Sequence, residues 1–279
     1  MSRNKKRLTG HKPEPTEVPT QLSPLSFVAP TEFVELPSKG EFYPDTHPLH
    51  GEETIEIRYM TAKDEDILTS QTLLKKGIAI DRFLQNVIIN KEIKVDDLLI
   101  GDKNAIIIAA RCSGYGSDYE ATVGCGECST KNRLNFNLAK PTIIESELHE
   151  KLNVTMNSQG TYTVKLPLSK YTAEVRLLTG LDETYLAQHM TNVRKNNLPE
   201  EIYTTQFKRL IISVEGHTDQ EVIDAFAENM PAVDSRHLRL VNRLITPNIE
   251  IKETLKCKKC GHTEEVDVPF GADFFWPKQ

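Results

Sequence analysis

The segments VGCGEC (residues 123–128) and LKCKKCGH (residues 255–262) decide the fold predicted for this chain. Each contains a CxxC motif between two stretches whose residues alternate as in a β-strand. These stretches are residues 119–123 and 133–138 around the first motif, and residues 249–255 and 263–268 around the second. The pattern predicts two β-hairpins, each with two cysteines at its tip.

The four cysteines of these motifs, Cys125, Cys128, Cys257 and Cys260, are the predicted ligands of one structural Zn²⁺ ion. Zn²⁺ prefers four tetrahedral thiolate or imidazole ligands, and two CxxC turns that face each other supply four thiolates. The hairpin pair resembles a zinc ribbon, but the gap between the motifs is far longer than the ~15–20 residues of an ordinary ribbon. A subdomain is therefore expected to be inserted between the two halves.

Other interpretations of the cysteines remain open. The motifs could be metal-free turns or a redox dithiol, although a redox motif opens a helix in a βαβ unit and these motifs lie between strands. His262 is either a surface neighbour of the site or a further ligand. Cys112 is either a small buried hydrophobic residue or a fifth ligand. Four thiolates leave no open coordination position, so a catalytic zinc is not indicated.

The chain is predicted to have an α+β fold, with a mainly helical N-terminal unit and a split, zinc-ribbon-like hairpin pair that flanks a mostly helical insertion. The predicted units are a flexible N-terminal arm (1–32), a mainly helical unit (33–116), the two halves of the zinc module (117–140 and 249–270), an inserted α/β subdomain (141–248) and a C-terminal tail (271–279). The basic start of the arm is expected to be solvated, with a phosphate or acidic partner as the alternative. Apart from the similarity of the two hairpins, no repeat is evident.

Apolar spacing and capping residues predict the helices. The expected N-caps of the N-terminal unit are Thr61, Asp81 and Asp102, for helices that end near Gly77, Ile88 and Cys112. The insertion is expected to hold helices at 182–195, 203–214, 218–229 and 235–244, and strands are expected at 53–59, 161–166 and 174–178. The acidic run 64–66 is interpreted as a solvated helix start, and the Gly-Tyr-Gly run 114–116 as a helix C-cap or, alternatively, a binding loop.

Composition limits the class of protein. Hydrophobic residues make up 38% of the 279 residues, which is enough for a core, so the chain is not disordered overall. The formal net charge of −6 does not support a general affinity for nucleic acid. No apolar run is long enough for a membrane helix, and the basic N-terminus lacks the apolar region of a secretory signal. Five cysteines without an export signal favour a reducing compartment.

No catalytic or cofactor-binding residues are predicted. The sequence has no GxxxxGK[ST] or GxGxxG phosphate loop, no HExxH and no GxSxG motif. Its many carboxylates are not paired in a motif that implies acid–base catalysis. The sequence therefore favours a protein that acts through contacts, and an enzyme is the least favoured class.

Three further segments carry a family resemblance. They are LPSKGEFYP (36–44), IRYMTAKDEDIL (57–68) and YGSDYE (115–120), the last of which leads into the first CxxC motif. In this order they resemble the baseplate hub family of T4-like contractile-tailed bacteriophages, which includes the small hub and hub-assembly proteins. The resemblance covers roughly residues 33–140, and the second CxxC hairpin is a further match.

The resemblance implies a non-enzymatic virion or late tail-assembly protein. Its partners would be other hub and tail proteins, namely the central spike, the hub ring and the tape measure; a homo-oligomer is left open, and no membrane is involved. It would act in the host cytoplasm during tail assembly, with or without remaining in the tail baseplate. The resemblance implies no catalytic residues in this chain. The only functional residues it implies are the four cysteines, as a structural site.

The alternative function is that of a zinc-ribbon protein that binds nucleic acid or acts in transcription. Lys256, Lys258 and Lys259 surround the second CxxC motif, and Lys131 and Arg133 follow the first. Such a local basic patch could contact phosphates. The negative overall charge, and the scarcity of aromatic residues among the basic ones, count against this alternative.

Overall fold

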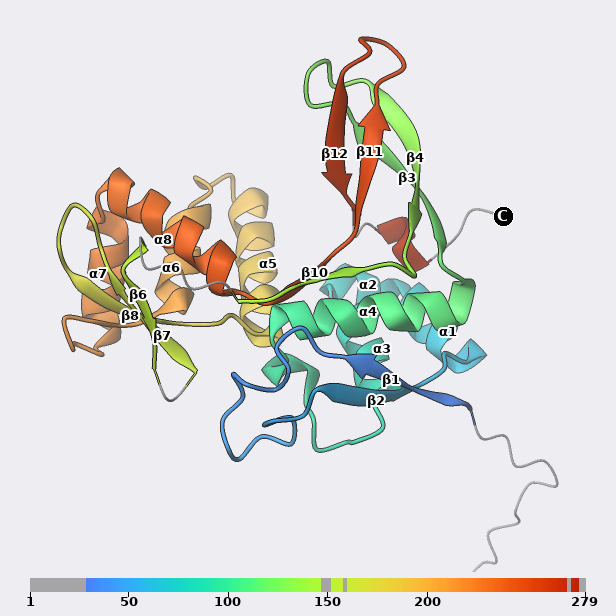
Figure 1. Cartoon of the computed structure of the whole chain (residues 1–279), viewed down its shortest axis with the longest axis horizontal. Helices are drawn as coiled ribbons and strands as arrows, with labels where there is room; N and C mark the ends of the chain where they lie inside the picture. The colour runs from blue at the N-terminus through green and yellow to red at the C-terminus, as the bar shows by residue number, and fades with distance from the viewer. Residues whose placement is uncertain (1–28, 147–151, 158–159, 270–271, 276–279) are drawn as a thin grey trace, which may run out of the picture.

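An antiparallel hairpin begins the described part of the chain: β1 (Thr31–Glu35) pairs with β2 (Thr54–Arg58). The structure is a computed structural model that describes residues 29–146, 152–157, 160–269 and 272–275 (Figure 1). Helices follow the hairpin, with a short 3₁₀ helix before the longest of them. They are α1 (Ala62–Thr69), α2 (Gln71–Lys76), α3 (Ala79–Val87), the 3₁₀ helix η1 (Val95–Asp97) and α4 (Ile100–Tyr115).

Several predicted helix boundaries in this region are wrong. The helix expected over residues 61–77 is two helices, because Ser70 has an extended backbone (φ −62°, ψ 109°) that ends α1 and begins α2. Both α3 and α4 begin before their predicted caps, so Asp81 and Asp102 lie in the first turns of these helices. The carboxylate of Asp81 pairs instead with Lys103 at 2.7 Å, and that of Asp102 is fully buried.

The rest of the described chain adds two hairpins, a four-stranded antiparallel sheet and further helices. The first CxxC hairpin is β3 (Asp118–Gly124) with β4 (Lys131–Asn137), and the second is β11 (Lys252–Lys256) with β12 (Thr263–Asp267). The sheet has the order β6 (Val154–Met156), β7 (Thr161–Lys165), β8 (Thr172–Arg176) and β9 (Ile211–Val214). The remaining elements are α5 (Gly180–Lys195), α6 (Ile202–Leu210), α7 (Gln220–Asn229), α8 (Ala232–Ile245), β5 (Thr142–Ile144), β10 (Asn248–Glu250) and η3 (Ala272–Phe275).

The predicted α+β fold is confirmed, but two predicted elements of the second half are divided differently. The helix expected at 203–214 ends at Leu210, because Ile211 and Val214 are buried in β9, which pairs with β8. The strand expected at 249–255 is interrupted at Ile251, since β10 pairs with β5 and β11 pairs with β12. The other helices and strands of this half lie within a few residues of their predicted positions.

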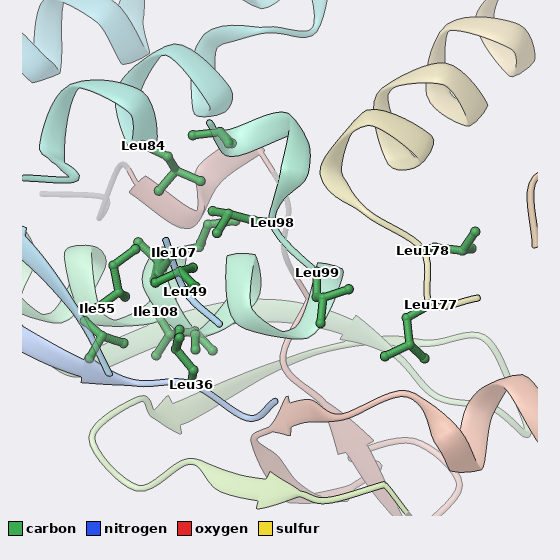
Figure 2. Close-up of a cluster of buried hydrophobic side chains, with 14 of the residues drawn as sticks. Leu36, Leu49, Ile55, Leu84, Leu98, Leu99, Ile107, Ile108, Leu177 and Leu178 are labelled. Carbon is green, nitrogen blue, oxygen red and sulfur yellow. The ribbon is translucent and has the colours of Figure 1, made fainter. Parts of the chain in front are cut away.

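Helix α4 lies at the centre of the molecule and carries much of the main hydrophobic core (Figure 1). Its residues Ile107 and Ile108 are buried, and Figure 2 shows them beside Leu49 and Ile55, which come from β2 and the connection before it. Leu178, which precedes α5, belongs to the same cluster. The core therefore joins both halves of the chain, and each such side chain contributes roughly 1.5–3 kcal/mol by leaving water.

In both halves of the chain, a buried aspartate holds the turn from a strand into a helix through the same hydrogen bonds. Arg58, at the end of β2, donates two hydrogen bonds of 2.6 and 2.9 Å to Asp64, which also accepts the backbone N–H of the preceding threonine cap. Arg176, at the end of β8, donates two of 2.7 and 2.8 Å to Asp182, which accepts from its own threonine cap in the same way. The sequence pattern Arg-x-x-Thr-x-x-Asp thus fixes the turn from a hairpin into a helix twice.

Asp64 is therefore not the solvated residue that the acidic run predicts. It is 0% exposed, whereas Glu65 and Asp66 beside it face solvent. Burial raises the pKa of Asp64, but the hydrogen bonds from Arg58, its threonine cap and Asn86 outweigh burial and lower the pKa to about 2. Asp64 is consequently an ionised, fully hydrogen-bonded anchor of the fold.

Each half of the chain contains a further buried aspartate in the first turn of a helix. These residues are Asp102 in α4 and Asp234 in α8. Asp102 accepts hydrogen bonds from N and Oγ of Ser38, in the connection after β1. Asp234 accepts two backbone N–H groups in the equivalent connection after β7. The same number of residues separates each aspartate from the first cysteine of the following CxxC motif. The similarity of the hairpins thus extends back through a first unit (β1 to β4) and a second unit (β7 to β12).

The predicted domain boundaries stay a prediction. Most of the predicted arm (residues 1–28) and part of the predicted tail (residues 271 and 276–279) lie outside the described residues. Among the helices of the described segments, none combines the length and the apolar character that crossing a membrane requires.

We expect Asp64→Asn, which keeps the side-chain shape but removes its charge, to destabilise the protein at neutral pH. The folded-state pKa of about 2 lies below the unfolded value of about 4, so the ionised group contributes roughly 2 kcal/mol above about pH 4. This contribution is lost as the pH falls from about 4 to about 2, so the variant should lose less stability over that range than the wild type. Urea unfolding followed by circular dichroism measures both effects.

Asp66→Asn is the matched control, because Asp66 lies on the same helix and is exposed. This variant should have the same stability as the wild type at neutral pH, and it should lose the same amount of stability as the pH falls from about 4 to about 2. An equal acid-induced loss in Asp64→Asn and the wild type would contradict the role given to Asp64.

Candidate metal centre

The two CxxC motifs close their hairpins with the same turn. In the first, Cys125 N donates to Thr130 O (3.0 Å) and Ser129 N donates to Cys125 O (2.8 Å). In the second, Cys257 N donates to the carbonyl five residues later (2.8 Å) and Gly261 N donates to Cys257 O (3.0 Å). Ser129 and Gly261 occupy the same position and have φ values of 55° and 74°. Both residues are therefore left-handed, a conformation that glycine adopts without steric cost.

The two turns face each other, so four sulfur atoms from distant parts of the sequence lie within 4.8 Å of one another. Cys125 Sγ lies 3.7 Å from Cys260 Sγ, and Cys128 Sγ lies 3.6 Å from Cys257 Sγ. Both short distances cross from one hairpin to the other, and the hairpin pair projects away from α4 (Figure 1). The structure thus brings together the four cysteines selected from the sequence.

The positions of the sulfur atoms fit a tetrahedral metal site. All four cysteines are free thiols, and bonded sulfurs would be only about 2.05 Å apart. With Zn–S bonds of ~2.3 Å, two sulfurs of a tetrahedral site lie about 3.8 Å apart, close to both short distances. Four sulfur ligands complete the coordination of such an ion, so no position is left for water or a substrate.

A reciprocal pair of hydrogen bonds joins the two turns. Asn132, on β4, accepts from Lys258 N of the second motif at 3.1 Å. Glu264, on β12, accepts from Gly126 N of the first motif at 2.7 Å. Asn132 and Glu264 follow their own CxxC motifs by the same number of residues, so the two contacts are equivalent. Each unit therefore holds the CxxC turn of the other unit.

Polar groups surround the sulfurs on the Asn132 side. Asn132 is 4% exposed, and its Nδ2 donates to Thr130 O at 2.8 Å and faces Cys257 Sγ at 3.8 Å. Lys259 N donates to Cys257 Sγ at 3.4 Å, and the Thr130 hydroxyl lies 3.2 Å from Cys128 Sγ. Donors such as Asn132 Nδ2 and Lys259 N stabilise thiolates that bind a metal and fix their orientation.

The pKa values of the thiols reflect this crowding. The backbone N–H groups of Cys260 and Lys259 lower the pKa of Cys257 to about 6. The backbone of His262 lowers the pKa of Cys260, but the neighbouring sulfurs outweigh it and the pKa is raised to about 12. Four thiols this close cannot all ionise unaided, because each thiolate disfavours the next. A divalent cation between them removes this conflict.

Little apolar surface holds the hairpin tips together. The cluster there consists of Cys125, Leu255 and Cys257, with Leu134 and Val266 packed against it. The bases of the hairpins belong instead to the main core, through Tyr119, Ala121, Phe136 and Val268. Packing therefore fixes where each hairpin begins, and a metal ion would fix how the tips meet.

The other candidate ligands lie outside the sulfur cluster. Over the described residues, the group of side chains that could hold a metal ion contains the four cysteines and neither His262 nor Cys112. His262 Nε2 lies 4.0 Å from Glu264 Oε2, at the edge of the site. Cys112 packs against the main core, and burial raises the pKa of its thiol. His262 is therefore a surface neighbour of the cysteines, and Cys112 is a small hydrophobic residue packed against the core.

The Gly-Tyr-Gly run ends helix α4. Gly116 is the C-cap and has a φ of 82°, which favours glycine. The Tyr115 hydroxyl donates to Glu65 Oε1 at 2.8 Å, and the Arg111 guanidinium lies over the Tyr115 ring. These contacts support the helix C-cap and not the binding loop.

The basic residues near the cysteines are mixed with acidic ones. Lys256, Lys258 and Lys259 are exposed. The same hairpin carries acidic residues on both strands, namely Glu253, Glu264, Glu265 and Asp267. The surface of the second hairpin is therefore not uniformly positive, and the nucleic-acid alternative gains no support from it.

Asn132 and Glu264 are not recognisable as site residues from the sequence alone. Neither residue type marks a metal site by itself, and nothing in a single CxxC motif points to them. The available signal is their equal spacing from the two motifs, which becomes visible when the units are aligned on their cysteines. The same alignment pairs Asp102 with Asp234 without a gap.

Comparison with known proteins gives one family. A family model described as T4 bacteriophage base plate protein matches residues 29–276, which include both units and both CxxC motifs. No curated protein and no solved structure matches the chain. The match covers most of the chain and confirms the family resemblance noted in the sequence. The chain therefore belongs to the T4 bacteriophage base plate protein family.

Proposed function

We propose that this protein is a non-enzymatic structural or assembly component of a phage baseplate hub. In this proposal a structural Zn²⁺ ion, bound by Cys125, Cys128, Cys257 and Cys260, joins its two units. The observation that carries the proposal is the meeting of four thiols from two distant hairpins, in a chain of the base plate family.

The proposed partners are other hub and tail proteins, with the central spike, the hub ring and the tape measure as candidates. Assembly takes place in the host cytoplasm, and the tail baseplate is the final location. A role through contacts also suits the buried carboxylates. Asp64 and Asp182 bind arginines, and Asp102 and Asp234 bind the connections after β1 and β7, so all four serve the fold.

The proposed zinc is structural because four sulfur ligands complete its coordination. When bound, the ion neutralises thiolates that would otherwise repel one another and links the tips of the two hairpins. Binding of this kind adds directly to the stability of the folded state. The ion would therefore fix how the surfaces of the two units are presented to a partner.

Metal analysis tests the site. Full-length protein purified without chelator is expected to contain one Zn²⁺ per chain, and replacement with Co²⁺ should give the visible absorption of tetrahedral thiolate ligation. The protein should also protect four of its five thiols from alkylation until the metal is removed. Well under one metal ion per folded chain would reject the zinc site.

Cys257→Ser should lose the metal and loosen the hairpin tips, while the main core stays folded, because the bases of the hairpins pack into that core. Hydrogen exchange should accelerate in residues 124–131 and 256–263 and stay slow in α4. Cys112→Ser is the matched control and should keep the metal, because Cys112 lies outside the sulfur cluster. Metal retention by Cys257→Ser would contradict the assignment of ligands.

Asn132→Leu should weaken metal binding without removing a ligand. The change removes the acceptor of Lys258 N and leaves that N–H without its partner across the site. We expect a loss of metal affinity of roughly 10–100-fold, as is usual when a residue that orients the metal ligands through hydrogen bonds is replaced. Competition with a chromophoric chelator measures it, and an unchanged affinity would show that the reciprocal contact is dispensable.

The baseplate role is tested in infected cells. Tagged protein should co-purify with tail proteins identified by mass spectrometry, and disruption of its gene should stop the production of complete tails. Absence of any tail protein from the purified material, together with normal infectious tails after disruption, rules the role out. The zinc measurement is independent of this result, so the two parts of the proposal can fail separately.

A further inference from the structure

The connection between the hairpin strands differs in length between the two units. In the first unit residues 36–53 join β1 to β2, and in the second unit only residues 166–171 join β7 to β8. The long connection lies on α4: the Tyr43 hydroxyl donates to Asp102 Oδ2 at 2.8 Å and accepts from Leu99 N at 3.1 Å. Leu49 of this connection is 2% exposed and packs beside Ile107 and Ile108 (Figure 2).

The short connection leaves the corresponding face of α8 uncovered. A groove of about 560 Å³ lies there, and its lining includes Pro167, Val233, Arg236, Arg239, Leu240 and Arg243. His237, also in the lining, is held by the fold, since its Nε2 lies 3.1 Å from Leu152 O. Alignment of the units on Asp102 and Asp234 places Arg239 and Leu240 of α8 where α4 has Ile107 and Ile108. The groove therefore occupies the place that the long connection fills in the first unit.

The groove combines positive charge with exposed apolar side chains. Arg236 and Arg243 are exposed, and no ion pair engages either of them among the described residues. Arg239 lies 4.1 Å from the centre of the Tyr203 ring. Val233 is 55% exposed and Leu240 is 37% exposed, and none of the residues that line the groove is acidic. This pattern stands out in a chain whose formal net charge is −6.

We propose that this α8 groove is a docking site for an acidic segment of another protein. Carboxylates of that segment would pair with Arg236 and Arg243, and an apolar side chain would lie between Val233 and Leu240, as Leu49 lies against α4. Arginine offers paired donors that match carboxylates, and a surrounding apolar contact strengthens such pairs by excluding water. That the partner is a tail protein rests on the proposed function.

The chemistry of the groove favours this occupant over others. The phosphates of a nucleic acid would satisfy the arginines but would leave Val233 and Leu240 without an apolar partner. The first residues of this chain carry basic side chains, including Arg3, Lys5 and Lys6, so their charge does not complement the groove. An acidic segment with one apolar side chain matches both components.

Site-specific photo-crosslinking in infected cells tests the proposal. The full-length protein carries p-benzoylphenylalanine in place of Leu240, the infected cells are irradiated, and crosslinked proteins from the assembled tails and from the rest of the lysate are identified by mass spectrometry. We expect one major crosslink, to an acidic segment of a different protein. A second protein with the probe at Val222, an exposed position on α7 outside the groove, should not give this product.

Charge reversal separates docking from chance proximity. Arg243→Glu added to the Leu240 probe protein should reduce the crosslink by roughly tenfold or more, as the loss of one good charge pair predicts. Arg243→Lys should reduce it less, because the charge is kept. Arg82→Glu is the matched control, since Arg82 is also exposed on a helix but lies outside the groove, and it should leave the crosslink unchanged. Thermal unfolding of each variant shows that it is folded.

Several results would overturn the docking site. They are a crosslink to nucleic acid, to a second copy of this protein or to its own chain, the absence of any crosslink in assembled tails, and a crosslink that Arg243→Glu does not weaken. If the protein co-purifies with tail proteins but the Leu240 probe gives no crosslink, the docking site is rejected and the proposed function is left intact. An arginine-dependent crosslink to an acidic segment of a protein outside the tail supports the groove and contradicts the proposed function.

Discussion

The mutual approach of four thiols is the constraint on which the arrangement of the two hairpin tips depends. Sulfur atoms within 4.8 Å of one another cannot all carry negative charge unless a cation or protons compensate. The tips of the hairpins share only a small apolar cluster, so packing does not supply the missing attraction. The reciprocal hydrogen bonds of Asn132 and Glu264 set the turns opposite each other, which leaves the four sulfurs in a geometry that suits a tetrahedral ion.

Within each unit, buried carboxylates have a comparable organising role. Burial of a charge is costly unless hydrogen bonds and an opposite charge compensate for it. Asp64 and Asp182 meet this condition with an arginine and a threonine cap. Asp102 and Asp234 accept hydrogen bonds from neutral donors in the connection after the first strand, and burial raises the pKa of Asp102. The same contacts at matching sequence positions make the two units versions of one structural plan, in agreement with a tandem duplication.

The two units have diverged most at the surface of the helix that precedes the CxxC hairpin. In the first unit the long connection after β1 covers α4 and gives the molecule its central core (Figure 2). In the second unit the short connection leaves α8 open, and arginine replaces isoleucine at a position that is buried in the first. Both units therefore contribute to the core, but only the second leaves this face of the helix open to solvent.

The sequence by itself determined the α+β class, the hairpins, the four candidate ligand cysteines and the family, because CxxC spacing, strand alternation and helix caps are local patterns. It did not determine that Asp64 is buried or that residues 211–214 form a strand, because both depend on contacts with other elements. The role of Asn132 and Glu264 also emerged only from the tertiary structure, since each contacts a turn more than a hundred residues away. Local chemistry selects the candidate ligands, but only the packing of both units on one core decides which side chains meet around them.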